Sequence, residues 1–183
     1  AIDVDIYKET AWAQAGATLG ELYYKIANAS ERHAFPVGVC GTIGLGGHIS
    51  GGGYGNLIRK YGLSADHVID AQVVTANGDI LDRKTMGEDL FRAIRGGGAA
   101  SFAVVLAWKL ELVRVPEKVT VFNIGRTLDE GATDVVLQWQ DFAPNADKNL
   151  FIRLQPRVIN GTTEGSRTIG VGFIGLYLGK AKK

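Results

Sequence analysis

One segment combines a high density of glycine with the single cysteine of the chain. Residues 35–55 read FPVGVCGTIGLGGHISGGGYG, with nine glycines and Cys40. Glycine loses more chain entropy on folding than any other residue, so this density predicts that something approaches the backbone closely. Successive main-chain N–H groups without a Cβ form a concavity that binds anions such as phosphate. A thiol beside such a concavity suggests a covalently held nucleotide cofactor; a set of tight turns packed between helices is the alternative.

The two most common nucleotide-binding patterns do not match this segment. The dinucleotide pattern GxGxxG fails because Ile49 stands where the third glycine would follow Gly44 and Gly46. No phosphate-loop pattern of the GxxxxGK type occurs in the sequence either. We therefore expect neither of the two folds that carry these patterns.

Composition and charge narrow the class of protein. The 183 residues are 46% hydrophobic and 21% charged, which predicts a globular protein with a sizeable core. No apolar run is long enough to span a membrane, so no membrane partner is expected. The formal net charge of +1 argues against nucleic acid as a partner. One cysteine and three scattered histidines give no zinc-binding spacing, so no metal site is expected.

The spacing of apolar residues predicts an α+β fold. Thr18 and Glu21 form a capping box ahead of residues 19–27, where apolar side chains recur at helical spacing. In this helix Tyr23 and Tyr24 are interpreted as packing residues rather than ligands. Further elements are strands over 3–7, 10–16, 68–75, 80–82 and 102–113, and helices over 57–61 and 88–95.

The pattern changes after Pro116. A strand is predicted over 119–126, then a helix over 132–142, then two strands over 150–159 and 168–178 that flank the turn sequence Asn160-Gly161. This order is typical of the start of an antiparallel sheet covered by a helix. Two domains are therefore expected, over 1–116 and 117–183.

Three stretches of the sequence resemble one group of plant flavoproteins. They are ATLGELYYKIA at 17–27, a stretch at 35–74 that begins with the glycine-rich segment, and LDRKTMGEDLFRAIRGGG at 81–98. In these stretches the chain resembles the berberine bridge enzyme-like family, within the vanillyl-alcohol oxidase type of FAD-dependent oxidoreductase. The resemblance is dense over 10–116 and looser beyond. It implies the second lobe of an FAD-binding domain followed by the beginning of an antiparallel-sheet substrate domain, and thus an internal segment of a longer protein.

The resemblance also implies which residues contact FAD. In these enzymes the cysteine that matches Cys40 bonds to C6 of the isoalloxazine ring, and a second, histidyl link is expected upstream of this segment. Further cofactor-binding residues are implied at Thr42, Ile43, Gly44, Gly46, Gly47, His48, Gly52, Gly53, Tyr54, Gly98 and Val104. From the residues alone, Cys40 could instead be a small buried hydrophobe and His48 could cap the next turn. Where the family commonly has glycine, this chain has Ala99 and Ala103, whose methyl groups are expected to narrow the groove near the adenine.

The activity implied by the resemblance is oxidation of an alcohol group on a carbohydrate or on a phenolic compound such as a monolignol. Hydride would pass to covalently bound FAD, and the catalytic base is expected outside this segment. Oxygen or another acceptor would reoxidise the flavin; Ile43, where the family can have valine, favours an acceptor other than oxygen. Two alternatives stay open: an alkaloid-type oxidative cyclase of the same family, and a non-catalytic defence, storage or allergen-type protein that retains the fold.

Two N-x-S/T triplets, at Asn28 and Asn160, are candidates for N-glycosylation. The resemblance implies a secreted protein of the cell wall or a vacuolar protein, where such glycans are added. The sequence does not indicate an oligomeric state.

Overall fold

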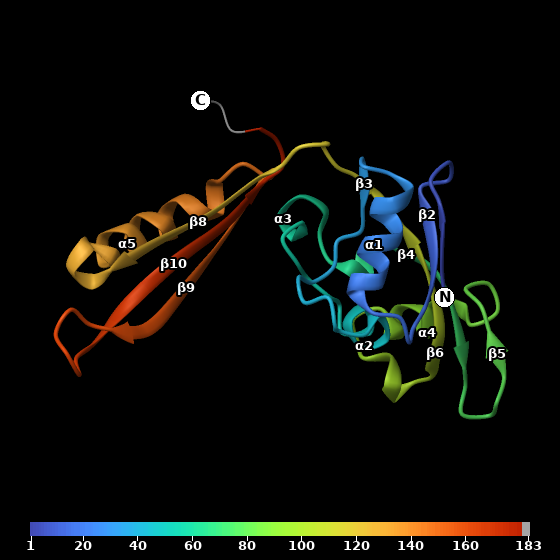
Figure 1. Ribbon diagram of the computed structural model, residues 1–183. Helices are drawn as coiled ribbons and strands as arrows, with labels where there is room; N and C mark the ends of the chain where they lie inside the picture. The colour runs from blue at the N-terminus through green and yellow to red at the C-terminus, as the bar shows by residue number, and fades with distance from the viewer. Residues whose placement is uncertain (181–183) are drawn as a thin grey trace. The chain divides into compact units, whose positions relative to one another are not determined.

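The computed structural model describes residues 1–180, which fall into two units divided between Glu117 and Lys118. Figure 1 labels their helices and strands, and each unit is described by itself. The last three residues of the predicted second domain, 181–183, lie outside the described residues. The assignment of one unit to the cofactor and the other to the substrate stays a prediction.

A five-stranded antiparallel sheet forms the centre of the first unit. Its spatial order is β1-β2-β6-β4-β5, and every neighbouring pair is antiparallel. The strands are β1 (Ile2–Asp5), β2 (Thr10–Gln14), β4 (Val68–Val74), β5 (Ile80–Leu81) and β6 (Val104–Glu111). A separate two-stranded ladder joins β3 (His33–Ala34) to β7 (Val113–Arg114).

The helices of this unit are α1 (Leu19–Ala29), α2 (Leu45–Ser50), α3 (Ile58–Tyr61) and α4 (Gly87–Ile94), with single 3₁₀ turns at η1 (Ser64–His67) and η2 (Ala99–Ser101). The predicted capping box is confirmed, because the Glu21 amide donates to Thr18 Oγ1 and the Thr18 amide donates to Glu21 Oε2, at 3.3 and 2.7 Å. This cap fixes the first turn of α1, which becomes important at the candidate site.

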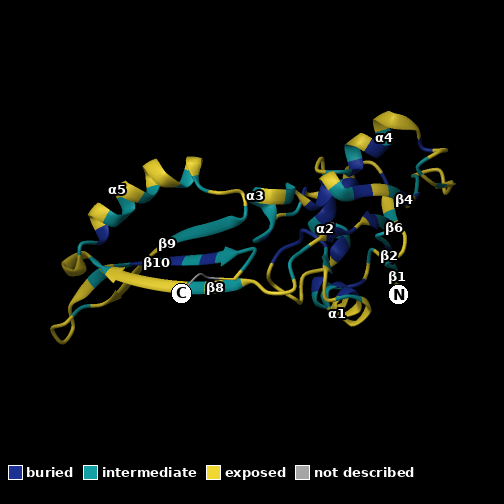
Figure 2. Ribbon diagram, turned by 90° about the horizontal axis from the view of Figure 1, so that it is seen from above, coloured by how far each residue is buried: buried dark blue, intermediate teal, exposed yellow. Residues whose placement is uncertain are grey.

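Apolar faces of the helices close over the sheet in one core. Trp108 and Leu110 of β6 are fully buried, as are Leu22 of α1, Leu45 of α2 and Ile94 of α4. Figure 2 shows the buried residues concentrated around α2, β4 and β6. Burial of each large apolar side chain stabilises the fold by roughly 1.5–3 kcal/mol. The core is therefore a stable base for the glycine-rich loops.

The second unit is a three-stranded antiparallel sheet with one helix. Its order is β8-β10-β9. The chain runs through β8 (Thr120–Thr127), η3 (Leu128–Glu130), α5 (Ala132–Phe142), η4 (Ala143–Asn145), β9 (Leu150–Asn160) and β10 (Arg167–Tyr177). Side chains of α5, among them Trp139, pack on Val171 and Phe173 of β10. The α+β fold with antiparallel sheets is thereby confirmed.

The structure differs from the prediction at four elements. The first two strands end at Asp5 and Gln14, two residues early, and a turn follows the first in which Glu9 has a positive φ of 52°. The predicted strand over 102–113 begins only at Val104, because the amides of residues 102 and 103 donate to the carbonyl of Ala99 in a 3₁₀ turn. The fourth is α2, a helix inside the glycine-rich segment that no helical periodicity predicts.

Candidate cofactor site

The single cysteine lies in a loop, residues 38–44, which we call the Cys40 loop and whose residues 39–44 are exposed. Cys40 is a free and exposed thiol. Its neighbours Val39 and Ile43 are also exposed, at 54% and 42%. A cysteine that served only as a small apolar packing residue would be buried. Within residues 1–180, Cys40 is therefore not packed in a core, and its sulfur is accessible to a ligand.

The first turn of α1 holds the Cys40 loop by its carbonyl oxygens. The amide of Leu19 donates to Ile43 O and the amide of Gly20 donates to Gly41 O, both at 2.9 Å. No Cβ fits comfortably at Gly20, where it would meet Gly41 O at 3.0 Å. These two amides are among the four that a helix N-terminus leaves without internal partners. Because both amides already donate to carbonyl oxygens of the loop, the N-terminus of α1 does not offer these two donors to an anion.

The donors open to a ligand belong to the Cys40 loop itself. Within residues 1–180, the amides of Gly41, Thr42 and Gly44 make no hydrogen bond. All three residues are exposed, and a Cβ built at Gly44 meets nothing within 4 Å. Successive free amides of this kind bind phosphates and carbonyl oxygens. Because these donors directly follow an accessible thiol in the chain, the loop fits a cofactor that is held both by hydrogen bonds and by sulfur.

His48 lies beneath the loop. Its Nε2 accepts a hydrogen bond from the amide of Gly38 at 3.0 Å. Burial lowers the pKa of the imidazole below its usual value, which favours the neutral ring that this acceptor role requires. His48 is half-buried and packs against Gly38 and Gly53. Its prediction as a flavin contact stays a prediction, while its hydrogen bond to the backbone of the loop is a feature that the sequence did not indicate.

Tyr23 and Ser64 hold the chain where the loop begins. The Tyr23 hydroxyl donates to Gly38 O at 2.6 Å and lies 3.0 Å from Val37 O, and the Ser64 hydroxyl donates to Pro36 O. Burial raises the pKa of Tyr23 to about 12, so the phenol stays a donor at neutral pH. The interpretation of Tyr24 as a packing residue is wrong, because successive helical residues face different directions and its side chain is 67% exposed.

Two glycines downstream are required by close contacts of the backbone. A Cβ at Gly55 would stand 1.8 Å from Val37 O, and one at Gly53 would stand 2.5 Å from Ser64 Oγ, where φ is also +68°. Real Cβ atoms do not approach other atoms so closely, so these glycines belong to the packing of the loop. Between them Tyr54 has a 57% exposed ring, which lies open to a ligand.

The other predicted segment, which begins at Gly96, is tied to the same region. The amides of Gly96 and Gly98 both donate to the carbonyl of Ser50, at the end of α2, at 2.9 Å. Val104 is 66% exposed at the start of β6. Ala99 and Ala103 are buried in the hydrophobic core, so their methyl groups do not narrow an open groove as expected. The structure thus brings α2, which contains Gly46 and Gly47, together with the Gly98 turn, and Gly52 lies just after α2 in the chain.

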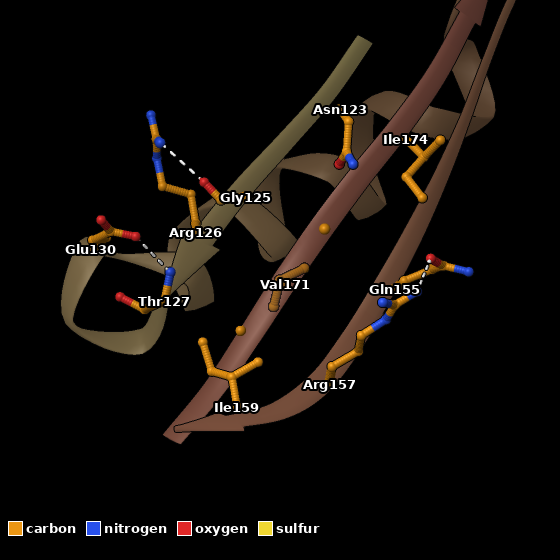
Figure 3. A pocket seen from close by; sticks show the side chains of 12 residues that line it. Asn123, Gly125, Arg126, Thr127, Glu130, Gln155, Arg157, Ile159, Val171 and Ile174 are labelled. Carbon is orange, nitrogen blue, oxygen red and sulfur yellow. Dashed lines mark hydrogen bonds between the residues drawn. The ribbon is translucent and has the colours of Figure 1, made fainter. Parts of the chain in front are cut away.

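A groove of about 390 Å³ lies on the second unit, on the face of the sheet opposite α5. Its floor includes Gly125 of β8 and Gly172 of β10, which are directly opposite each other in the ladder. A Cβ at Gly125 would meet nothing within 4 Å, so packing does not require glycine there. Figure 3 shows Asn123 at one end of the groove, with Gln155 and Arg157 along β9.

Sequence reasoning missed this groove, although the alternation of Gly170 and Gly172 with the buried Val171 and Phe173 was a signal for it. Glycine at every second position of a strand leaves one face of that strand without side chains.

Neither unit contains a cluster of three or more metal-ligating side chains among the described residues. Over the same residues, no helix is long and apolar enough to cross a membrane.

Comparison with known proteins relates the chain to flavoproteins. Residues 1–83 match the family described as FAD binding domain. The chain is 58% identical over 182 residues to berberine bridge enzyme-like 5 of Arabidopsis thaliana and, over the same length, to tetrahydroberberine oxidase of Berberis wilsoniae. Each alignment covers 100% of this chain and 34% of the relative. The chain therefore spans about a third of the length of these relatives.

Among solved structures, the chain is similar to Phl p 4, described as a grass pollen allergen with glucose dehydrogenase activity. The TM-score is 0.90 and the identity 47%, over 98% of this chain and 35% of that protein. A variant of Phl p 4 in which one isoleucine is replaced by valine is described as a glucose oxidase, whereas the wild-type protein is described as a glucose dehydrogenase. The likeness covers both units of this chain.

Proposed function

We propose that this chain, which belongs to the berberine bridge enzyme-like family of FAD-binding oxidoreductases, carries the Cys40 side of the flavin site in an enzyme that oxidises alcohols. The substrate would be a carbohydrate or a phenolic compound such as a monolignol. The observation that carries the proposal is the exposed Cys40 in a loop whose amides at Gly41, Thr42 and Gly44 are free among the described residues. A glycine loop that only formed tight turns would not need an accessible thiol among unused donors.

These residues would hold the cofactor in two ways. The free amides of the Cys40 loop would donate to its electronegative atoms, and Cys40 would form a thioether with C6 of the ring. Forming that bond replaces a ring hydrogen by sulfur and releases two electrons and two protons, which an oxidant such as dioxygen must accept. FAD supplies, when bound, the two-electron acceptor for hydride from the substrate. The protein's own contribution is to orient the thiol and to keep His48 neutral beneath the loop.

We propose that the groove on the second unit contributes contacts to the substrate. Asn123, Gln155 and Arg157 offer amide and guanidinium groups, which hydrogen-bond well to hydroxyls, around a floor that includes several glycines. Such a surface suits a hydroxyl-rich ring that lies flat on the sheet. The relative with glucose dehydrogenase activity supports a sugar as substrate, and tetrahydroberberine oxidase supports the alternative of an alkaloid-type oxidation.

We further propose that the enzyme is a dehydrogenase rather than an oxidase. Ile43 lies in the Cys40 loop with 42% of its surface exposed, where its side chain can restrict the approach of dioxygen. Isoleucine has one methylene group more than valine. The Phl p 4 variant with isoleucine replaced by valine, described as a glucose oxidase, supports this interpretation.

The test uses the purified full-length protein. A yellow protein whose Cys40 peptide carries the mass of FAD, and whose flavin bleaches anaerobically with a sugar or a monolignol, supports the proposal. Bleaching only with tetrahydroberberine-like alkaloids would favour the oxidative cyclase. A colourless protein with unmodified Cys40 would overturn the proposal and favour a non-catalytic protein of the allergen type, an alternative that the similarity to pollen allergens keeps open.

We also propose that the protein is secreted to the cell wall or reaches the vacuole, with glycans on Asn28 or Asn160. Both asparagines are exposed, Asn28 on α1 and Asn160 at the end of β9. A mass loss on enzymatic removal of N-glycans, mapped to either peptide from the native plant protein, tests this. Unmodified asparagines in that material would contradict it.

A further inference from the structure

Both ends of the Cys40 loop are fixed to one turn of α1. On the downstream side, the amides of Leu19 and Gly20 hold Ile43 O and Gly41 O. On the upstream side, the Tyr23 hydroxyl contacts Val37 O and Gly38 O, at 3.0 and 2.6 Å. Residues 19, 20 and 23 lie within about one turn of helix, so Cys40 is suspended between two attachments to the same rigid element.

The downstream attachment is made by backbone amides, whereas the upstream attachment is made by a side chain, that of Tyr23. A phenol has a single proton, so the hydroxyl shares it between two carbonyl oxygens, with the shorter contact to Gly38 O. Val37 and Gly38 are buried, whereas Val39 and Cys40 are exposed. The hydroxyl therefore acts at the point where the chain leaves the core, two residues before the sulfur.

Two other contacts hold this segment, but from other elements. Ser64 of η1 donates to Pro36 O, and His48 of α2 accepts from the Gly38 amide. They fix the chain to the core beneath the loop, whereas Tyr23 fixes it to the helix that also holds the far side of the loop. Removal of the Tyr23 hydroxyl would leave two buried carbonyl oxygens without this donor and would release only one of the two attachments to α1.

We propose that Tyr23 is a positioning residue for Cys40, and that its hydroxyl sets the place of the sulfur for thioether formation with the flavin. This inference rests on the proposed function, because it concerns the covalent attachment of the cofactor. The hydrogen bonds of the Tyr23 hydroxyl go to the carbonyl oxygens of Val37 and Gly38. Its effect passes through the backbone of residues 37–40. A displacement of about 1 Å at a reacting atom is enough to slow a reaction by up to about a hundredfold.

The chain offers a matched control in the adjacent residue. Tyr23→Phe removes one oxygen atom and keeps the buried ring, while Tyr24→Phe removes the same atom from a side chain that is 67% exposed. Both variants and the wild type are made as full-length proteins. The readouts are the fraction of Cys40 peptide that carries flavin after purification and the deuterium exchange of a peptide spanning 35–43.

We expect Tyr23→Phe to lower the flavin-bearing fraction of Cys40 about fivefold and to speed deuterium exchange of the 35–43 peptide about tenfold, with Tyr24→Phe matching the wild type. If the flavin-bearing fraction of Cys40 is the same in Tyr23→Phe as in a flavin-bearing wild type, the positioning role of Tyr23 is overturned while the proposed function stands. If the wild-type protein has no flavin on Cys40, the covalent attachment itself is overturned, and the inference with it.

A fluorinated tyrosine at position 23 keeps the measurement possible should the phenylalanine variant not fold. Fluorination makes the phenol ionise at a lower pH, and an ionised phenol cannot donate to carbonyl oxygens. Exchange of the 35–43 peptide, divided by its exchange in the wild-type protein at the same pH, should then rise with the ionisation of the fluorinated phenol. A ratio that stays constant across that ionisation would overturn the inference, because a side chain that only filled space would give that result.

Discussion

The imidazole of His48 accepts a hydrogen bond at Nε2 from the amide of Gly38, over 3.0 Å. The ring also fills the space that side chains at two glycines would occupy. A Cβ at Gly38 would stand 2.9 Å from the ring carbon Cε1, and a Cβ at Gly53 would stand 2.8 Å from Cδ2 and Nε2. The two glycines and the histidine thus form one packing unit under the Cys40 loop. The unit depends on a neutral ring, because a protonated Nε2 carries a hydrogen and cannot accept.

This dependence predicts a loss of stability in mild acid. Burial lowers the pKa of folded His48, so protons bind more readily to the unfolded chain, and the free energy of unfolding should fall as the pH drops below about 6.5. His48→Gln keeps an acceptor that does not titrate in this range. Urea unfolding at pH 7.5 and 5.5 should therefore show a smaller acid-induced loss in the variant than in the wild type. Equal losses in both proteins would contradict the role of His48 as a neutral acceptor.

Because Gly55 lies so close to Val37, we expect a single added methyl group at position 55 to destabilise the protein severely. At Gly55 an added Cβ would lie 1.8 Å from Val37 O, and neither atom belongs to a flexible side chain. Gly55→Ala should lower the free energy of unfolding by more than about 3 kcal/mol or prevent folding. Gly47→Ala is the matched control, since its Cβ would meet nothing within 4 Å inside α2.

Alanine at that control position should be neutral or stabilise the protein by up to about 1 kcal/mol, because alanine is the better helix former. Urea unfolding of both variants measures the difference. Similar stabilities for the two variants would show that the backbone at Gly55 moves aside, which would contradict the close approach to Val37.

Much of the fold could be predicted because it rests on local signals. The capping box of Thr18 and Glu21 and the helical apolar spacing after it give α1, and the apolar spacing after Ala132 gives α5 over the predicted residues. The turn residues Asn77-Gly78, with φ of +88° at Gly78, give the hairpin of β4 and β5. In each case the residues that determine the element lie within a few positions of it.

The helix α2 could not be predicted, because its stability comes from distant residues. Its sequence LGGHIS has two glycines, which disfavour a helix by about 1 kcal/mol each. The helix forms because the amides of Leu45 and Gly46 donate to the carbonyls of Ala17 and Ala15, about thirty residues earlier in the chain. The attachment of the Cys40 loop to α1 was missed for the same reason. A sequence pattern indicates which residues suit a ligand site. It does not show which of their hydrogen-bond donors are already bonded to other parts of the protein.

We expect loss of the Cys40 thiol to change the reduction potential of the flavin and the rate of substrate oxidation in the full-length protein. On the proposed function, Cys40→Ala should retain flavin, through the histidyl link expected upstream, but with a lower reduction potential and slower oxidation of substrate, because a sulfur substituent on the ring would make the flavin a stronger oxidant. Potentiometric titration and anaerobic stopped-flow reduction measure the two effects. A potential and a reduction rate equal to those of the wild type would exclude a role for the thiol. Cys40→Ser, which keeps the size of the side chain without sulfur, should behave like the alanine variant.

Ile43 predicts how the reduced enzyme reacts with oxygen. Its side chain is 42% exposed in the Cys40 loop, three residues after the sulfur. Ile43→Val removes one methylene group and should speed reoxidation by dioxygen about tenfold or more, relative to reoxidation by a quinone that does not need to pass the side chain. Ile43→Leu keeps the volume and should reoxidise as slowly as the wild type, measured by stopped flow after anaerobic reduction. Rapid peroxide formation by the wild-type enzyme at air saturation, or the same ratio of rates in all three proteins, would show that Ile43 does not restrict oxygen.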